Sequence, residues 1–158
     1  MTKWGLSLAA LLFSSWGQSS ELSVELPDGK VETLSMQTIE QALPKVSFTT
    51  SLPWFKEAKK YTGVPAEQLL KYYDINDASA MSFIALNDYA ATTVIEDIEN
   101  YHPVIVYKLD DQKMRIREKG PFWLVFNLDK YPQLNNELFY SQMVWQIDKI
   151  IIHRDNGE

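Results

Sequence analysis

Alternating apolar and polar positions divide most of the chain into short strands. Residues 22–26 read Leu, Ser, Val, Glu and Leu, which is the period of a strand with one buried face. Residues 46–50 repeat this alternation, and residues 80–86 are mostly apolar, as in a more deeply buried strand. The same criteria predict further strands over residues 31–34, 92–95, 103–109, 114–117, 122–126 and 143–152.

Two segments have the apolar spacing of short helices. Ser35 or Thr38 is suited to cap a helix over residues 36–43. Residues 65–73 open with a proline, which favours the first helical position, and residues 96–100 predict either a third helix or a polar turn. The chain therefore predicts one α+β domain of mixed β-sheets with a barrel-like arrangement and two or three short helices. Turns or irregular segments are predicted at residues 27–29, 61–65, 87–89 and 129–140.

Residues 114–126, MRIREKGPFWLVF, concentrate candidate chemistry in one stretch. Arg117 and Lys119 stand two apart, so an extended strand would place both cations on one face. The Gly120-Pro121 pair then predicts a turn, and Trp123 opens the next apolar run. Two interpretations follow. Either these residues hold a flat, anion-bearing small molecule, or they form a turn between core strands with the cations in solvent.

Composition excludes several classes of function. The chain has 158 residues and a formal net charge of −6, which argues against nucleic acid as a partner. It contains no cysteine, so thiolate catalysis, disulfides and cysteine-bound metals have no residue to use. The two histidines, His102 and His153, lie far apart in sequence, which leaves little material for a histidine-based metal site.

The first twenty residues predict a signal peptide. Lys3 is their only charge, and residues 6–13 form an apolar run of the length of a signal-peptide core, too short to span a bilayer. Small polar residues follow, which places the cleavage between Gly17 and Glu21. We therefore expect residues 21–158 to be an exported, periplasmic domain without direct membrane insertion after cleavage. The alternative is a buried helix at the N-terminus.

Five motifs give the chain a resemblance to a known family. They are FTTSLPW at 48–54, YTGVPAEQLLKYY at 61–73, ALNDYAATTV at 85–94, MRIREKGPFWLVF at 114–126 and VWQIDKIIIH at 144–153. Their order and spacing resemble a small, single-domain branch of the oxidoreductase molybdopterin-binding family over about residues 21–154. The M-x-x-R-x-K-G-P-x-W string is the most specific of them. The resemblance implies a sulfite-oxidase-like fold.

One departure from that family bears on function. In its catalytic members a cysteine thiolate binds molybdenum at the end of the strand that residues 46–51 resemble, and here Thr49, Thr50 and Ser51 stand there. A hydroxyl is a poor substitute for a soft thiolate, so molybdenum redox chemistry is not expected. The combination resembles exported pterin-binding regulators such as PruR. It implies a reduced, molybdenum-free pterin as ligand, no metal, and a membrane cyclic-di-GMP enzyme (diguanylate cyclase or phosphodiesterase) whose periplasmic domain is the partner.

The chemistry of a pterin indicates which side chains would bind it. A pterin is a flat heteroaromatic that needs a ring to stack on, acceptors for its amino edge and donors for its carbonyl group. The candidate residues are the rings of Trp54, Trp123 and Tyr89, acceptors at Asp88 and near Gly120, donors at Asn87, Arg117 and Lys119, and the hydroxyls of Thr50 and Ser51.

Structural interpretations of single residues stay open beside these. Trp145 on the predicted closing strand is expected in the core, and Arg117 has a carboxylate as an alternative partner to the ligand. Phe139, Tyr140 and Met143 form either an exposed apolar patch or part of the core. Two other functions also remain, a molybdenum-dependent oxidoreductase with an oxygen ligand to the metal, and a ligand-independent periplasmic adaptor.

Overall fold

A computed structural model of the protein describes residues 20–155, arranged as two five-stranded sheets with helices packed around them. The predicted signal peptide lies outside the described residues except for its last one. In the first sheet, the register of β1 against β10 is parallel and the other pairings are antiparallel. Its strands, in spatial order, are β2 (Val31–Ser35), β1 (Glu21–Glu25), β10 (Ile147–Arg154), β5 (Ala78–Ala85) and β6 (Ala90–Val94).

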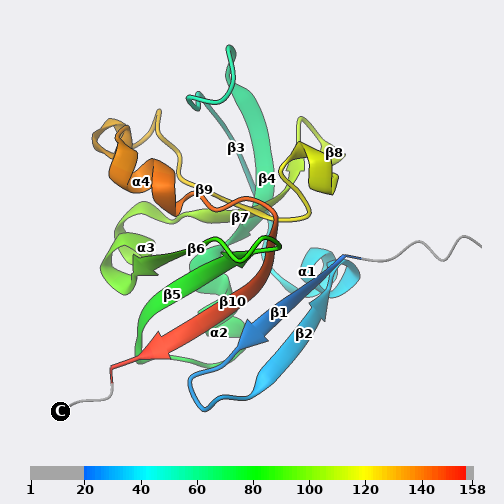
Figure 1. The fold of residues 1–158 in the computed structure, drawn as a ribbon, viewed down its shortest axis with the longest axis vertical. Helices are drawn as coiled ribbons and strands as arrows, with labels where there is room; N and C mark the ends of the chain where they lie inside the picture. The colour runs from blue at the N-terminus through cyan, green and yellow to red at the C-terminus, as the bar shows by residue number, and fades with distance from the viewer. Residues whose placement is uncertain (1–19, 156–158) are drawn as a thin grey trace, which may run out of the picture.

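The second sheet lies above the first in Figure 1, and all its pairings are antiparallel. The connection between its first two strands projects from the top of the molecule (Figure 1). The order is β3, β4, β7 and β8, with β9 paired to β7 beside this path. The bounds are β3 (Val46–Thr50), β4 (Lys59–Pro65), β7 (Val104–Leu109), β8 (Gln112–Lys113) and β9 (Trp123–Val125).

Within residues 20–155 four short α-helices cover the sheets, where the sequence predicted two or three. Ser35 caps the first helix, its hydroxyl accepting from the Thr38 amide, and Asn136 caps the fourth. No helix among residues 20–155 is long and apolar enough to cross a membrane. The helices are α1 (Met36–Ala42), α2 (Ala66–Tyr72), α3 (Ile95–Tyr101) and α4 (Glu137–Gln142), with 3-10 turns η1 (Ile116–Glu118) and η2 (Pro132–Leu134).

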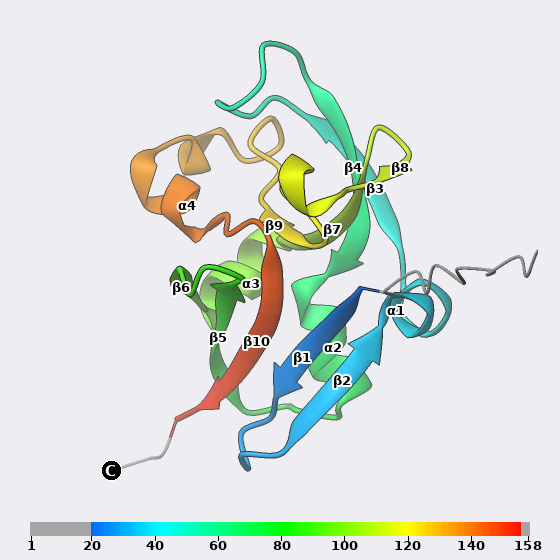
Figure 2. The ribbon, with the colours of Figure 1, turned by 45° about the vertical axis from the view of Figure 1, so that its right-hand side comes forward.

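The core lies between the sheets and under the helices. Strand β7 and the segment around β9 supply much of it, because residues 104–106 and 122–126 are buried on both faces. The rotated view of Figure 2 shows β1 and β2 standing apart from the second sheet, with α1 at the end of β2. These observations confirm the predicted α+β class and single domain.

Four sequence predictions of secondary structure were wrong, three of them outside the segment with the two cations. Residues 61–65 belong to strand β4 and do not form a turn. A glycine fits in this strand because a Cβ on Gly63 would lie 2.1 Å from the carbonyl oxygen of Ile105 on β7. Residues 129–140 were predicted to be irregular, but they contain η2 and most of α4. The prediction failed because the sequence analysis did not recognise Asn136 as a helix cap. Residues 143–146 are irregular, since β10 begins only at Ile147.

The segment with the two cations was also predicted incorrectly. Residues 114–117 do not extend β8. They lead into the turn η1, where Arg115 and Glu118 bridge one turn with a 2.5 Å ion pair. Arg117 therefore lies in a 3-10 turn, and Lys119 follows it with a left-handed backbone at φ +78°. The two side chains do not share the face of a strand.

Candidate functional site

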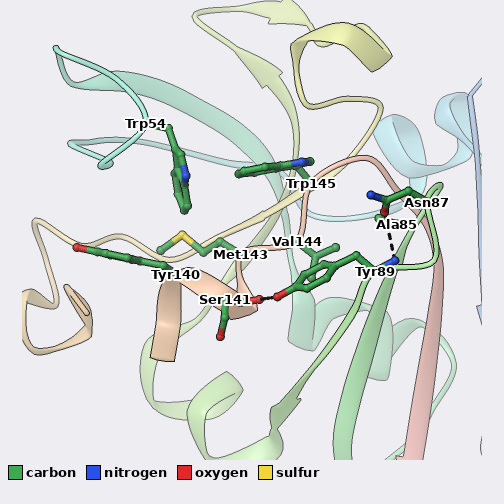
Figure 3. Close-up of a pocket in the computed structure, with 9 residues that line it drawn as sticks. All are labelled: Trp54, Ala85, Asn87, Tyr89, Tyr140, Ser141, Met143, Val144 and Trp145. Atoms are coloured by element: carbon green, nitrogen blue, oxygen red, sulfur yellow. Dashed lines mark hydrogen bonds between the residues drawn. The ribbon is translucent and has the colours of Figure 1, made fainter. Parts of the chain in front are cut away.

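An aromatic-lined cavity of about 300 Å³ opens between three separate segments of the chain. They are the β3–β4 connection, the end of β5 with the turn that follows it, and residues 140–145, which form the end of α4 and the segment after it. Figure 3 shows Trp54, Trp145 and Tyr140 around the opening, with Met143 between them. The full lining is Trp54, Ala85, Asn87, Tyr89, Tyr140, Ser141, Met143, Val144 and Trp145.

The rings meet edge to face, the geometry that aromatic quadrupoles favour. The Trp54 ring lies 5.4 Å from the Trp145 ring at 86° and 5.9 Å from the Tyr140 ring at 65°. The fully buried Trp123 contacts both indoles, at 5.6 Å from Trp54 and 6.2 Å from Trp145. Trp54, Trp145 and Tyr140 are half-buried, so each keeps ring surface available to a ligand.

Hydrogen bonds fix the segment that carries Trp145 to the second sheet. The Trp123 indole N–H donates to the Met143 carbonyl at 3.0 Å, and the Leu124 amide donates to the Val144 carbonyl at 2.9 Å. The Gln146 amide then donates to the Lys119 carbonyl at 2.9 Å. Residues 143–146 are therefore held without belonging to a strand. These bonds bring Lys119 next to Trp145.

Lys119 places its ammonium among the indoles. Its Nζ lies 3.5 Å from the ring centroid of Trp145, 5.4 Å from that of Trp123 and 5.7 Å from that of Trp54. Within residues 20–155 no carboxylate lies within 4.0 Å of this nitrogen. Burial lowers the pKa of Lys119 from its usual 10.5, because desolvation disfavours the charged form. The indole faces are thus the main stabilising partners of this cation.

Polar groups line the side of the cavity near the first sheet. The Tyr89 hydroxyl donates to the Ser141 carbonyl at 2.7 Å, which joins the β5–β6 turn to the end of α4 (Figure 3). The Asn87 side-chain oxygen accepts from the Tyr89 amide at 3.2 Å. No partner within the described chain takes the Asn87 amide N–H₂ group. That group is a donor available to a bound molecule.

The two hydroxyl candidates have structural partners. Thr50 is fully buried, and its Oγ1 accepts from the Asp129 amide at 3.0 Å. The Ser51 amide donates to the Asp129 carboxylate at 3.1 Å, with the Ser51 hydroxyl at 3.5 Å from the same oxygen. These bonds attach the end of β3 to the loop after β9. Neither side chain is among the cavity-lining residues.

The other candidates divide into three groups. Asp88 is exposed in the β5–β6 turn with φ +66°, next to the lining residues but not one of them. Gly120 and Trp123 are buried and do not line the cavity, and a Cβ on Gly120 would lie 2.2 Å from the Met114 carbonyl oxygen. Arg117 lines a different cavity of about 470 Å³, together with Phe55 and Lys119. Of the ten predicted site residues, Trp54, Asn87 and Tyr89 line the aromatic cavity, and Lys119 contacts two of its rings.

Sequence reasoning missed Trp145, Tyr140 and Met143 as parts of the cavity wall. Trp145 was assigned to the core because it alternates with Met143 and Ile147, as a strand would require. In the structure only Met143 and Ile147 are buried, and Trp145 is half-exposed. The uninterrupted apolar and aromatic content of residues 143–145 was the available signal that this segment is not a half-buried strand.

Comparisons with known proteins support the fold. No family model and no curated protein matches this chain. A solved structure, the sulfane dehydrogenase SoxCD from Paracoccus pantotrophus, matches with a TM-score of 0.63 and 12% sequence identity. The match covers 85% of this chain and 38% of the SoxCD chain, so this chain spans well under half of that protein. The protein is an α+β domain of the sulfite-oxidase-like fold.

Proposed function

We propose that this protein is an exported, pterin-binding regulatory protein and not an enzyme. The observation that carries the proposal is the cavity walled by Trp54, Trp145 and Tyr140, with the ammonium of Lys119 beside it. The motif resemblance to pterin-binding regulators of the PruR kind supplies the ligand class and the periplasmic location. The fold shared with SoxCD is the sulfite-oxidase-like fold that the same motifs imply.

The dimensions and chemistry of the cavity suit a bicyclic heteroaromatic ring. A volume of about 300 Å³ lies at the lower end of small-molecule sites. Trp54 and Trp145 provide stacking surfaces, and base–aromatic stacking contributes roughly 1–3 kcal/mol per ring. The Asn87 amide N–H₂ group, which has no partner within the described chain, is a donor for the ring carbonyl. Lys119 favours a ligand with negative charge.

The chain's residues do not fit a cysteine-ligated molybdenum centre. The sequence contains no cysteine, and the hydroxyls at the end of β3 are bonded to Asp129. Among residues 20–155 no group of three His, Asp or Glu side chains is arranged to hold a metal ion. We therefore derive no metal-dependent step for this protein.

The regulatory part of the proposal concerns a membrane partner. The regulators that the motifs resemble act with diguanylate cyclases or phosphodiesterases, and we propose the periplasmic domain of such a cyclic-di-GMP enzyme as partner. A ligand transmits its occupancy only if its affinity differs between the free and the partnered protein. The loop that carries Trp54 projects from the molecule (Figure 1). A partner can therefore contact the side of the cavity that this loop forms.

The first experiment is to identify what the native protein carries. The full chain is expressed with its own leader, purified from periplasm and denatured. The released small molecules are oxidised, separated and measured by fluorescence, and molybdenum is measured in the same sample. Pterin near one per chain without molybdenum is the expected result. Pterin with stoichiometric molybdenum would instead identify a molybdenum-dependent oxidoreductase.

If neither pterin nor molybdenum is found, a titration decides between weak binding and a ligand-independent adaptor. Reduced pterins are titrated into wild type, Trp54→Ala and Tyr72→Ala. Tyr72 is an exposed aromatic of α2 that does not line the cavity, so its removal is a matched control. Saturable binding that is lost only in Trp54→Ala supports the proposal. Absence of binding at millimolar pterin contradicts it.

A further inference from the structure

A cavity of about 470 Å³ lies beside η1. Phe55, Leu109 and the buried Met114 form its apolar surface. Phe55 directly follows Trp54, which lines the aromatic cavity, so two consecutive aromatic residues line one cavity each. The cavity beside η1 and the aromatic cavity are therefore neighbours in the structure.

Lys119 contributes to both cavities. It lines the cavity beside η1, and its ammonium lies 3.5 Å from the ring centroid of Trp145 and 5.7 Å from that of Trp54. Both of these rings line the aromatic cavity. A negatively charged group next to this ammonium would therefore lie where the two cavities meet.

Both acidic side chains that line the cavity beside η1 already have cationic partners. Asp110 pairs with Lys59 at 3.4 Å, and Glu118 pairs with Arg115 at 2.5 Å. The Asp110 carboxylate also accepts from the Lys60 amide at 2.9 Å. These contacts engage the negative charge of the cavity wall away from its remaining cations.

Two cations of the same cavity lack such a partner. Within residues 20–155 no carboxylate lies within 4.0 Å of the side-chain nitrogens of Arg117 or Lys119. Lys113, by contrast, pairs with Glu40 at 3.2 Å. In a chain of net charge −6, two unpaired cations lining one cavity favour an anionic occupant. The planar guanidinium of Arg117 suits a carboxylate or a phosphate, because it can donate two parallel hydrogen bonds.

We propose that the ligand of this protein is a pterin with an anionic substituent, a phosphate or a carboxylate, that lies in the cavity beside η1. The pterin ring occupies the aromatic cavity, the substituent passes Lys119, and Arg117 binds its terminal anion. Phe55 and Met114 contact the apolar part of the substituent. This inference rests on the proposed function, because it takes the pterin ring in the aromatic cavity as given.

Titrations of the full chain with three reduced pterins test this inference. Tetrahydroneopterin has an uncharged side chain, its monophosphate carries a phosphate ester, and tetrahydrofolate carries a glutamate tail. We expect one of the two anionic pterins to bind wild type about ten-fold more tightly than tetrahydroneopterin, because hydrogen bonds to charged groups are the stronger ones. The anionic pterin that binds more tightly identifies the substituent. Raising the salt concentration from about 0.05 M to about 0.5 M should reduce the preference, because Arg117 is exposed and salt screens its charge.

Two variants with the same change in net charge provide the matched comparison. Arg117→Gln removes the proposed anion contact without altering a residue of the aromatic cavity. In this variant the preference should fall to about two-fold or less, while tetrahydroneopterin binds as in wild type. Lys71→Gln on α2 removes an exposed cation that lines neither cavity and should retain the full preference.

Equal affinity of the three pterins for wild type would overturn the inference and leave the proposed function intact. A preference that Arg117→Gln retains would overturn it in the same way, by placing the anion elsewhere. A preference that Lys71→Gln also loses would show long-range attraction without a contact, which likewise overturns it. If none of the three pterins binds, the proposed function fails, and this inference fails with it.

Discussion

The ammonium of Lys119 lies 3.5 Å from the ring centroid of Trp145, and burial keeps the pKa of this lysine below its usual value. Two opposing effects act on the contact, because the indole face stabilises a cation while desolvation disfavours it. Within residues 20–155 no carboxylate lies within 4.0 Å of the ammonium to offset the desolvation. An anionic ligand would therefore stabilise the charged form of Lys119 more strongly than the indole face does.

This lowered pKa predicts a pH dependence of stability. A lysine whose folded pKa is depressed destabilises the folded state while it is charged in both states, below its folded pKa. That penalty disappears as pH rises from the folded pKa to the unfolded value near 10.5. We expect the free energy of unfolding of wild type, relative to Lys119→Met, to rise with pH through this window. Urea denaturation of both proteins from pH 8 to pH 11 measures it, and a constant difference would contradict the assignment.

The tryptophans of the site should separate stability from binding. Trp123 is fully buried with its indole N–H bonded, so Trp123→Ala should lose about 3–5 kcal/mol of stability. Trp54 is half-buried at the cavity opening, so Trp54→Ala should lose about 1–2 kcal/mol while weakening pterin binding by at least ten-fold. Denaturant unfolding and pterin titration of both variants provide the measurements. If Trp54→Ala binds pterin with the affinity of wild type, the Trp54 ring is not part of the binding site.

Gly120 should be intolerant of a side chain. A Cβ there would lie 2.2 Å from the Met114 carbonyl oxygen and 2.6 Å from its carbonyl carbon, and backbone atoms cannot rotate away. We expect Gly120→Ala to destabilise the protein by about 3 kcal/mol or more. Gly29→Ala is the control, because its Cβ would meet nothing within 4 Å and only its φ of +85° costs about 1–2 kcal/mol. Equal losses in the two variants would contradict the packing argument.

The Arg115–Glu118 pair makes a prediction about η1. Hydrogen bonds from Arg115 lower the pKa of Glu118 to about 2. A depressed carboxyl pKa stabilises the turn above the unfolded value near 4.5 and loses that effect as pH falls toward 2. Carbon-13 NMR of the Glu118 carboxyl should give a midpoint near 2 in wild type. The midpoint should move toward 4.5 in Arg115→Gln, and an unchanged midpoint would show that the pair is not formed in solution.

Much of the fold was accessible from local pattern. The strands β1, β3 and β7 were predicted from alternation, and α1 from the Ser35 cap, because burial on one face and capping are local requirements. Strand β4 was missed because Gly63 and Pro65 are turn residues by composition. Gly63 occurs in a strand here because the backbone of β7 lies too close for a side chain at position 63.

The candidate site was accessible only in part. Trp54, Asn87 and Tyr89 follow strand ends, where sites tend to form, and this is a sequence-level signal. Arg117 and Lys119 were grouped because an extended chain would align them. Both residues line the cavity beside η1, but only Lys119, with its left-handed backbone, places its cation against the rings of Trp145 and Trp54.

The sequence alone determined the α+β class, the absence of thiolate chemistry and the presence of cationic and aromatic residues around the Gly-Pro turn. It could do so because composition and short periodic patterns are properties of neighbouring residues. Only the tertiary structure decided that Trp145 faces a cavity and that Lys119 rests on its ring. That contact depends on hydrogen bonds from Gln146 to Lys119 and from Trp123 to Met143, which join segments far apart in the chain.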